Sequence, residues 1–157
     1  MMKRIFSVIA CVLCASWLWA ALPMVEVKDI DGKTLHVETL AQQGKPVIIS
    51  FFATWCKPCL RELTAIHDVY ADWQDETGVE MYIVSIDQGQ DCKKVKPLVD
   101  GYDWEYRVLL DPNGELKRAM NVQNVPHLFV IDSHGNVVYN HTGYTDGDET
   151  EIRKYLK

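Results

Sequence analysis

The chain has 157 residues, of which 48% are hydrophobic and 24% charged, and its formal net charge is −6. This length suits one globular domain that buries its own core, so neither a metal ion nor a disulfide framework is needed for folding. The acidic balance argues against nucleic acid as a partner, because a polyanion attracts basic surfaces.

The first 21 residues differ in composition from the rest of the chain. A short basic start at residues 1–4 precedes an uncharged, mostly apolar run at residues 5–21, which ends in two alanines. This order of segments is typical of a secretory signal, and the apolar run is of borderline length for spanning a bilayer. We therefore expect residues 1–21 to be a signal peptide or an N-terminal membrane anchor, with lipidation at Cys11 as a third outcome. Residues 22–157 are then the folded domain.

The cysteines are few once that segment is set aside. Loss of residues 1–21 would remove Cys11 and Cys14 and leave Cys56, Cys59 and Cys92. Three cysteines cannot form a full disulfide framework, so one close pair and one odd thiol are expected. We expect Cys92 to be a partly buried free thiol.

The first half of the domain shows clear strand and helix signals. Residues 25–30 and 34–37 flank the turn signal Asp31-Gly32 and predict a short hairpin. Residues 47–52 form an almost wholly apolar run, which suits a central strand covered on both faces. A mostly apolar set of side chains then recurs at helical spacing, namely Leu60, Leu63, Ile66, His67 and Tyr70. Gly78 is expected to end that helix.

The second half continues the alternation. Strands are predicted at residues 79–86, 106–110, 128–131 and 136–139, the last two forming a hairpin around residues 133–135. Helices are predicted at residues 91–99, where Gly101 would be the stop, and at residues 115–120 and 149–156. This pattern predicts an α/β fold with a mixed central sheet and helices on both faces.

The motif Trp55-Cys56-Lys57-Pro58-Cys59 lies where the predicted strand ends and the helix begins. Unpaired N–H groups and a partial positive charge at a helix N-terminus favour a thiolate, so the pKa of the Cys56 thiol should fall. Cys59 lies one helical turn further on and can resolve a mixed disulfide between Cys56 and a substrate. Pro58 fits the first helical turn, because its missing N–H costs little there.

Val125-Pro126 precedes the predicted strand at residues 128–131. A proline at a strand entry often marks a bend and sometimes a cis peptide bond, although an ordinary trans turn is the commoner case.

The Cys-Lys-Pro-Cys motif after an apolar strand, followed later by Val125-Pro126, resembles the thioredoxin superfamily. The N-terminal hairpin and the extra helix near residues 91–99 are similar to the TlpA/ResA-like branch of extracytoplasmic thiol–disulfide oxidoreductases. The resemblance implies a thioredoxin-like three-layer sandwich with an N-terminal β-hairpin extension. It also implies that Pro126 is cis and lies against the active-site disulfide. Trp55, Val125 and Pro126 would then bind substrate, with the Val125 backbone hydrogen-bonded to a bound peptide.

The acidic residue near the motif sets this chain apart from cytoplasmic thioredoxins. Those proteins carry a buried Asp six residues before the first cysteine, where this chain has Ser50. TlpA/ResA-like proteins instead carry a Glu shortly after the second cysteine, which Glu62 matches. Glu62 is three residues beyond Cys59, so the two side chains can share a helix face. We therefore expect Glu62 to have a raised pKa and to exchange a proton with Cys59, or alternatively to be a solvated surface residue.

Two other functions use related features. A peroxiredoxin shares this fold, but its peroxidatic cysteine follows a threonine by three positions, and Ala53 stands there in this chain. A copper or zinc carrier could use the cysteine pair with a distal ligand such as His127.

The resemblance implies a reductant of protein disulfides that acts in the bacterial periplasm or cell envelope. The expected catalytic residues are Cys56, Cys59 and Glu62, without a cofactor or a resident metal. The expected partners are oxidised proteins or apocytochromes and a membrane electron donor, and the chain is expected to be a monomer. The motif alone does not set the direction, because reductants, oxidants and isomerases all share it.

Overall fold

The computed structural model describes residues 22–41 and 44–157. The predicted signal or anchor at residues 1–21 lies outside the described residues, together with Cys11 and Cys14. Among the helices that are described, none combines the length and the apolar character that a membrane span requires.

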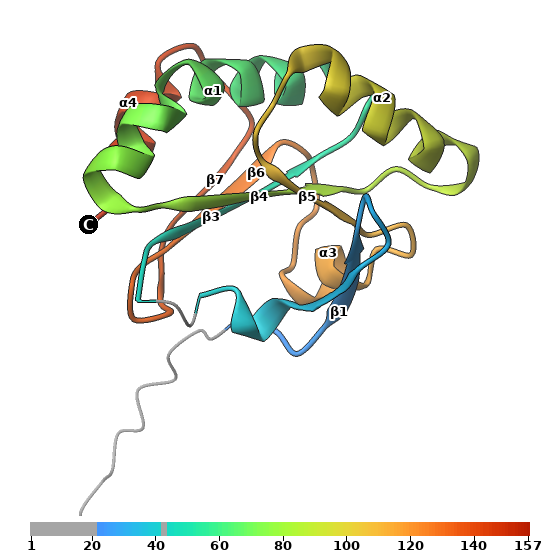
Figure 1. The fold of residues 1–157 in the computed structure, drawn as a ribbon, viewed down its shortest axis with the longest axis horizontal. Helices are drawn as coiled ribbons and strands as arrows, with labels where there is room; N and C mark the ends of the chain where they lie inside the picture. Colours follow the sequence, from blue (N-terminus) through green and yellow to red (C-terminus); the bar gives the residue numbers. More distant parts are fainter. Residues whose placement is uncertain (1–21, 42–43) are drawn as a thin grey trace, which may run out of the picture.

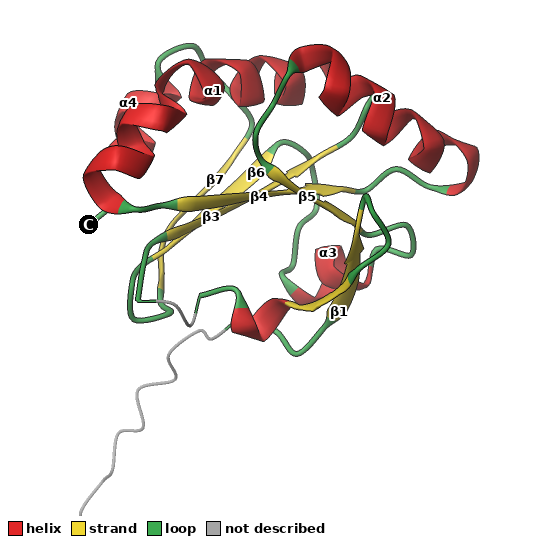
Figure 2. Ribbon diagram, viewed as in Figure 1, coloured by secondary structure: helices red, strands yellow, loops and turns green. Residues whose placement is uncertain are grey.

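The described residues form one sheet of seven strands, coloured yellow in Figure 2. The strands are β1 (Glu26–Asp29), β2 (Thr34–His36), β3 (Val47–Phe52), β4 (Glu80–Ser85), β5 (Arg107–Leu110), β6 (His127–Ile131) and β7 (Val137–Thr142). Their order is β2-β1-β5-β4-β3-β6-β7. Strands β3, β4 and β5 run parallel to one another, and every other neighbouring pair is antiparallel. The predicted mixed sheet and N-terminal hairpin are therefore confirmed.

Helices cover both faces of this sheet. The α-helices are α1 (Lys57–Thr77), α2 (Cys92–Tyr102), α3 (Glu115–Ala119) and α4 (Asp148–Arg153), and the 3-10 turns are η1 (Val37–Thr39) and η2 (Gly89–Asp91). Figure 1 shows α1, α2 and α4 above the sheet and α3 below it. The three-layer thioredoxin-like sandwich is thus confirmed.

The burial of the central strand β3 on both faces explains why its sequence is almost entirely apolar. All six of its residues are buried. Ile48 and Phe52 pack in the core under α1, whereas Ile49 and Phe51 pack in the core on the opposite face. A strand covered on both faces has no solvent side, so apolar and polar residues do not alternate along it. Ser50 is its one polar residue.

Two helix ends show which residues stop a helix. Gly78 ends α1 in the left-handed conformation, with φ of 70°, as expected for a C-terminal glycine. The predicted stop at Gly101 is wrong, because α2 continues through it to Tyr102. Asp103 takes the left-handed position instead, with φ of 55°, which a short polar side chain tolerates better than most.

Two predicted boundaries near the C-terminus also differ from the structure. The closing helix α4 begins one residue early and ends at Arg153, although Leu156 beyond it is still buried. Strand β7 continues past Tyr139 to Thr142, which pairs with His127 of β6. The extra strand residues are polar and lie at the sheet edge, so no apolar pattern indicated them.

Candidate functional site

The loop between β3 and α1 presents the first cysteine of the motif. Cys56 is the N-cap of α1, with extended backbone angles, and its N–H donates to the carbonyl oxygen of Ala53 at 3.0 Å. Pro58 occupies the first turn of the helix, where no hydrogen bond is lost. The motif therefore lies at a helix N-terminus, as its sequence predicts.

Cys56 and Cys59 are joined by a disulfide. The Cys59 backbone N–H donates to Cys56 Sγ at 3.3 Å. Cys56 is 6% exposed, whereas Cys59 is fully buried at 0%. An incoming substrate can therefore reach the Cys56 sulfur first, and the helix N-terminus stabilises negative charge on that same sulfur.

Two of the three residues that the resemblance assigns to substrate binding line the same cavity. Trp55 is 64% exposed, which is rare for a tryptophan. Trp55 and Val125 line one open cavity of about 490 Å³. Its other lining residues are Ile86, Gln88, Asp91, Lys117, Gln123 and Asn124. We call this cavity the Trp55 groove.

Pro126 directly follows Val125 and lies at the entry to β6. It is buried, and the peptide bond between Val125 and Pro126 is cis, as the resemblance implied. The Pro126 carbonyl accepts a 2.8 Å hydrogen bond from the N–H of Gly143. Gly143 follows β7 with φ of 89°, a value that glycine adopts without strain. The loops that follow β7 and precede β6 are thereby held together beside the groove.

Glu62 is a buried carboxyl group one turn beyond Cys59 on α1. It is only 2% exposed, so the alternative of a solvated surface residue is wrong. Burial raises the pKa of Glu62 to about 8. A hydrogen bond from Ser50 Oγ, 2.8 Å from Glu62 Oε2, opposes part of this rise, and the Asp148 carboxylate adds to it. Glu62 can therefore gain or lose a proton close to neutral pH.

A second buried carboxylate, Asp87, was missed by the sequence analysis. It follows β4 and is 2% exposed. Its Oδ2 accepts from the Thr54 N–H at 2.9 Å and from Ser85 Oγ at 2.8 Å, and its Oδ1 accepts from Thr54 Oγ1 at 2.7 Å. An acidic residue directly after an apolar strand was the one available signal, and it does not reveal which loop the carboxylate contacts.

Cys92 is a half-buried free thiol, as expected. Its Sγ–H donates to the carbonyl oxygen of Asp87 at 2.9 Å. Burial raises the pKa of this thiol, and the nearby Asp87 carboxylate raises it further. Cys92 is therefore a weaker nucleophile than an ordinary cysteine at neutral pH.

His127, the residue considered as a distal metal ligand, takes part in strand packing. Its ring stacks on Phe129 with centroids 4.5 Å apart, and burial lowers its pKa. Within residues 22–41 and 44–157, no cluster of three or more His, Cys, Asp or Glu side chains has the geometry of a metal site.

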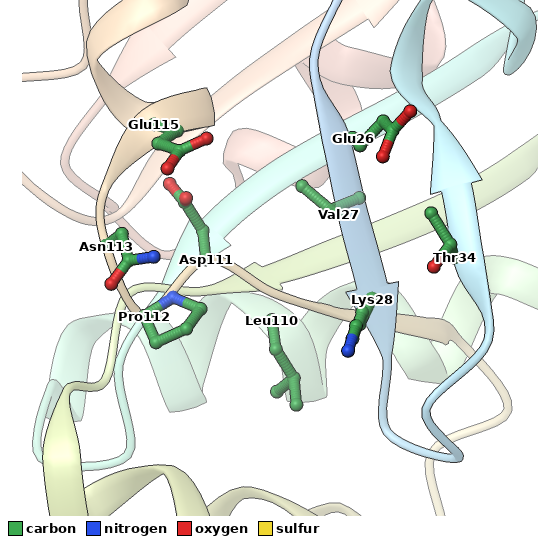
Figure 3. Close-up of a pocket in the computed structure, with 9 residues that line it drawn as sticks. All are labelled: Glu26, Val27, Lys28, Thr34, Leu110, Asp111, Pro112, Asn113 and Glu115. Carbon is green, nitrogen blue, oxygen red and sulfur yellow. The ribbon is translucent and has the colours of Figure 1, made fainter.

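Another cavity, of about 470 Å³, lies beside β1 and α3 and is drawn in Figure 3. Its lining contains Glu26, Asp111 and Glu115 but no cysteine. The Asp111 carboxylate is already bonded, because it accepts from the N–H groups of Leu116 and Lys117 at the start of α3. Neither Cys56 nor Cys59 lines this cavity.

Comparisons with known proteins agree with this geometry. The family model described as AhpC/TSA family matches residues 20–140. The thiol-disulfide oxidoreductase ResA of Bacillus thuringiensis is 32% identical over 135 residues, covering 86% of this chain and 74% of that protein.

Solved structures give the same result. The solution structure of a thioredoxin-like protein from Porphyromonas gingivalis is 62% identical, with a TM-score of 0.77, covering 88% of this chain and 90% of that one. The structure of dsbF from MTB is 28% identical, with a TM-score of 0.72, covering 87% and 98% of the two chains. The chain therefore belongs to the AhpC/TSA family and is a thioredoxin-like thiol–disulfide oxidoreductase of the ResA type, with Cys56 and Cys59 as its cysteine pair.

Proposed function

We propose that this chain reduces disulfide bonds of other proteins in an extracytoplasmic compartment. The observation that carries the proposal is the unequal burial of the two cysteines. Cys56 follows Trp55 of the groove in the chain and is 6% exposed, whereas Cys59 is 0% exposed. This arrangement suits a protein-sized substrate, which forms a mixed disulfide with the Cys56 sulfur and is then released when the Cys59 sulfur attacks.

The reaction consumes the reduced, dithiol form of the pair. The Cys56 thiolate attacks one sulfur of the substrate disulfide, forms a mixed disulfide and expels the other substrate sulfur as a thiolate, which takes up a proton. Cys59, as a thiolate, then attacks Cys56 Sγ and expels the second substrate sulfur. The substrate gains two electrons and two protons, and the chain ends with its Cys56–Cys59 disulfide.

Glu62 supports the second step as a proton acceptor. Cys59 must lose its proton before it attacks, and its sulfur is closed off from water. A carboxylate with a pKa of about 8 is basic enough to take that proton near neutral pH. Cys56, Cys59 and Glu62 are therefore the proposed catalytic residues.

The Trp55 groove is the proposed substrate site. An extended peptide can lie beside Val125 and exchange main-chain hydrogen bonds with it, a mode that needs no particular side chain in the substrate. Trp55 offers a large exposed apolar surface that such a peptide can cover. Pro126 fixes the backbone that follows Val125, through the cis peptide bond that joins the two residues.

The cellular setting is proposed from residues 1–21 and from the chemistry of the pair. A signal or anchor there would place the domain in the bacterial periplasm or cell envelope. The oxidised pair must be reduced again, for which a membrane thiol–disulfide relay is the proposed electron donor. Oxidised proteins or apocytochromes are the proposed substrates, and the domain is proposed to act as a monomer.

Reduction of insulin by the purified chain, with dithiothreitol as electron source, tests the activity. The chain should accelerate insulin precipitation above the dithiothreitol rate, and Cys56→Ser should abolish that acceleration. Cys92→Ser should behave as the unchanged chain and is the matched control. Acceleration that survives in Cys56→Ser, or none in the unchanged chain, would overturn the proposal.

A further inference from the structure

The parallel pairing of β3 and β4 brings two loops side by side at the active-site edge of the sheet. Phe52, the last residue of β3, is the register partner of Ser85, the last residue of β4. The next residue, Ile86, donates its N–H to the Phe52 carbonyl at 2.9 Å. The loop that carries Thr54 and Cys56 therefore begins next to the loop that carries Asp87.

Asp87 joins these two loops through Thr54. Its carboxylate binds both the backbone N–H and the side-chain hydroxyl of Thr54, at 2.9 and 2.7 Å. The third donor, Ser85, belongs to the strand from which Asp87 itself emerges. A buried carboxylate is costly unless its oxygens are well bonded. Two of its three donors here come from the segment just before the nucleophile.

We propose that Asp87 is a positioning residue that fixes the segment from Thr54 to Cys56 and so aims the Cys56 sulfur at the Trp55 groove. The proposal rests on the reductase function proposed above and extends it. The segment is held at two points, because the Cys56 N–H also bonds to Ala53 within the same turn. Asp87 supplies the point that comes from outside this turn.

The same residue also bonds to the start of α2, next to two other lining residues of the groove. Its backbone carbonyl accepts from Cys92 Sγ, at the first residue of α2. Gln88 and Asp91 lie between these two residues and line the groove with Trp55. The side chain of Asp87 thus bonds to the loop that carries Cys56, and its main chain bonds to the start of α2, after the segment that carries Gln88 and Asp91.

The contacts of Asp87 allow the role of its hydrogen bonds to be separated from that of its charge. In Asp87→Asn, an amide oxygen placed at Oδ2 can still accept from the Thr54 N–H and from Ser85. The amide nitrogen can donate to Thr54 Oγ1 once that hydroxyl turns round. Asp87→Ala loses every bond to Thr54. Ser85→Ala removes both hydrogen bonds between Ser85 and Asp87 and none to Thr54, so it is the matched control.

The experiment uses the full chain in five variants: Asp87→Ala, Asp87→Asn, Ser85→Ala, Thr54→Val and Thr54→Ser. Far-ultraviolet circular dichroism first selects the temperature at which each variant is folded. Two quantities are then measured, namely kcat/KM for insulin reduction and the hydrogen exchange rate of the Thr54 and Cys56 amides. A purely structural role would lower the unfolding temperature without changing either quantity in the folded protein.

We expect Asp87→Ala to lower kcat/KM by about 10-fold or more and to speed exchange of the Thr54 amide by a similar factor, because small misplacements of a reacting group are costly. Thr54→Val should shift both quantities in the same direction and by less, since the backbone bond remains. Asp87→Asn, Thr54→Ser and Ser85→Ala should stay within about 3-fold of the unchanged chain.

Unchanged kcat/KM and exchange in folded Asp87→Ala would overturn the proposal, and so would Asp87→Asn being as impaired as Asp87→Ala. The exchange measurement needs no substrate. It therefore still tests whether Asp87 fixes the segment if the unchanged chain proves unable to reduce insulin, which would contradict the proposed function alone.

Discussion

Ser50 on β3 and Glu62 on α1 form a buried pair in which the serine hydroxyl donates a 2.8 Å hydrogen bond to the carboxyl group. Both side chains are shielded from solvent, at 0% and 2% exposure. The acidic group of this site therefore comes from the helix, one turn beyond Cys59, and the strand contributes only a neutral donor. This arrangement gives the site a carboxyl group with a pKa of about 8.

The raised pKa of Glu62 predicts a stability that falls as pH rises. In the unfolded chain Glu62 ionises near its ordinary pKa of 4.5, whereas in the folded chain it stays protonated up to about 8. The stabilising contribution is therefore complete below pH 4.5 and is lost progressively up to pH 8. Glu62→Gln should remove this slope, which amounts to a change on the order of 4 kcal/mol.

Urea unfolding of the oxidised chain at a series of pH values measures this slope. Glu105→Gln changes the same charge at an exposed position and is the control. Curves of unfolding free energy against pH that stay parallel for Glu62→Gln and the unchanged chain would show that Glu62 does not titrate as described.

The proton relay makes a second prediction for the same variant. If the Glu62 carboxylate accepts the proton of Cys59, insulin reduction should rise through pH 8 in the unchanged chain. Glu62→Gln should be several-fold slower at pH 8 and should lack that rise, because no base lies beside the buried thiol. An identical shape of the two pH profiles of kcat/KM would exclude the relay.

The order of attack predicts which single variant traps a substrate. Cys59→Ser should accumulate a mixed disulfide between Cys56 and an oxidised protein, because the resolving sulfur is missing. Non-reducing electrophoresis followed by mass spectrometry of the linked peptide identifies the sulfur involved. Cys56→Ser should trap nothing, since buried Cys59 does not meet the substrate. Trapping that depends on Cys92 would contradict this order.

Trp55 should matter for protein substrates and not for folding. Its side chain is 64% exposed, so Trp55→Ala should change the unfolding free energy by less than about 0.5 kcal/mol. We expect kcat/KM to fall several-fold with insulin and to change little with oxidised glutathione, which is too small to cover the groove. Equal losses with both substrates would place Trp55 in the chemistry and not in docking.

The sequence predicted much of the fold because its main signals are local. The almost wholly apolar β3, the helix after it and the hairpins were all readable from residue spacing, and Cys56 and Cys59 were readable from their motif. Helix ends were less readable, since Gly101 fits inside a helix while Asp103 adopts the left-handed angle. A glycine permits a stop but does not require one.

Contacts between distant segments were not predictable in the same way. Ser50 and Glu62 were each singled out, yet their hydrogen bond depends on the packing of α1 across β3. Asp87 was missed because its partner, Thr54, is 33 positions away in the chain. A buried carboxylate and an exposed one have the same sequence signature, so only the fold separates them.

The reduction potential of the Cys56–Cys59 couple, measured by equilibration with glutathione buffers, tests the central claim most directly. A reductant should have a value close to that of thioredoxin, about −270 mV. A value near that of DsbA, about −120 mV, would make the pair an oxidant and contradict the proposed direction of electron flow.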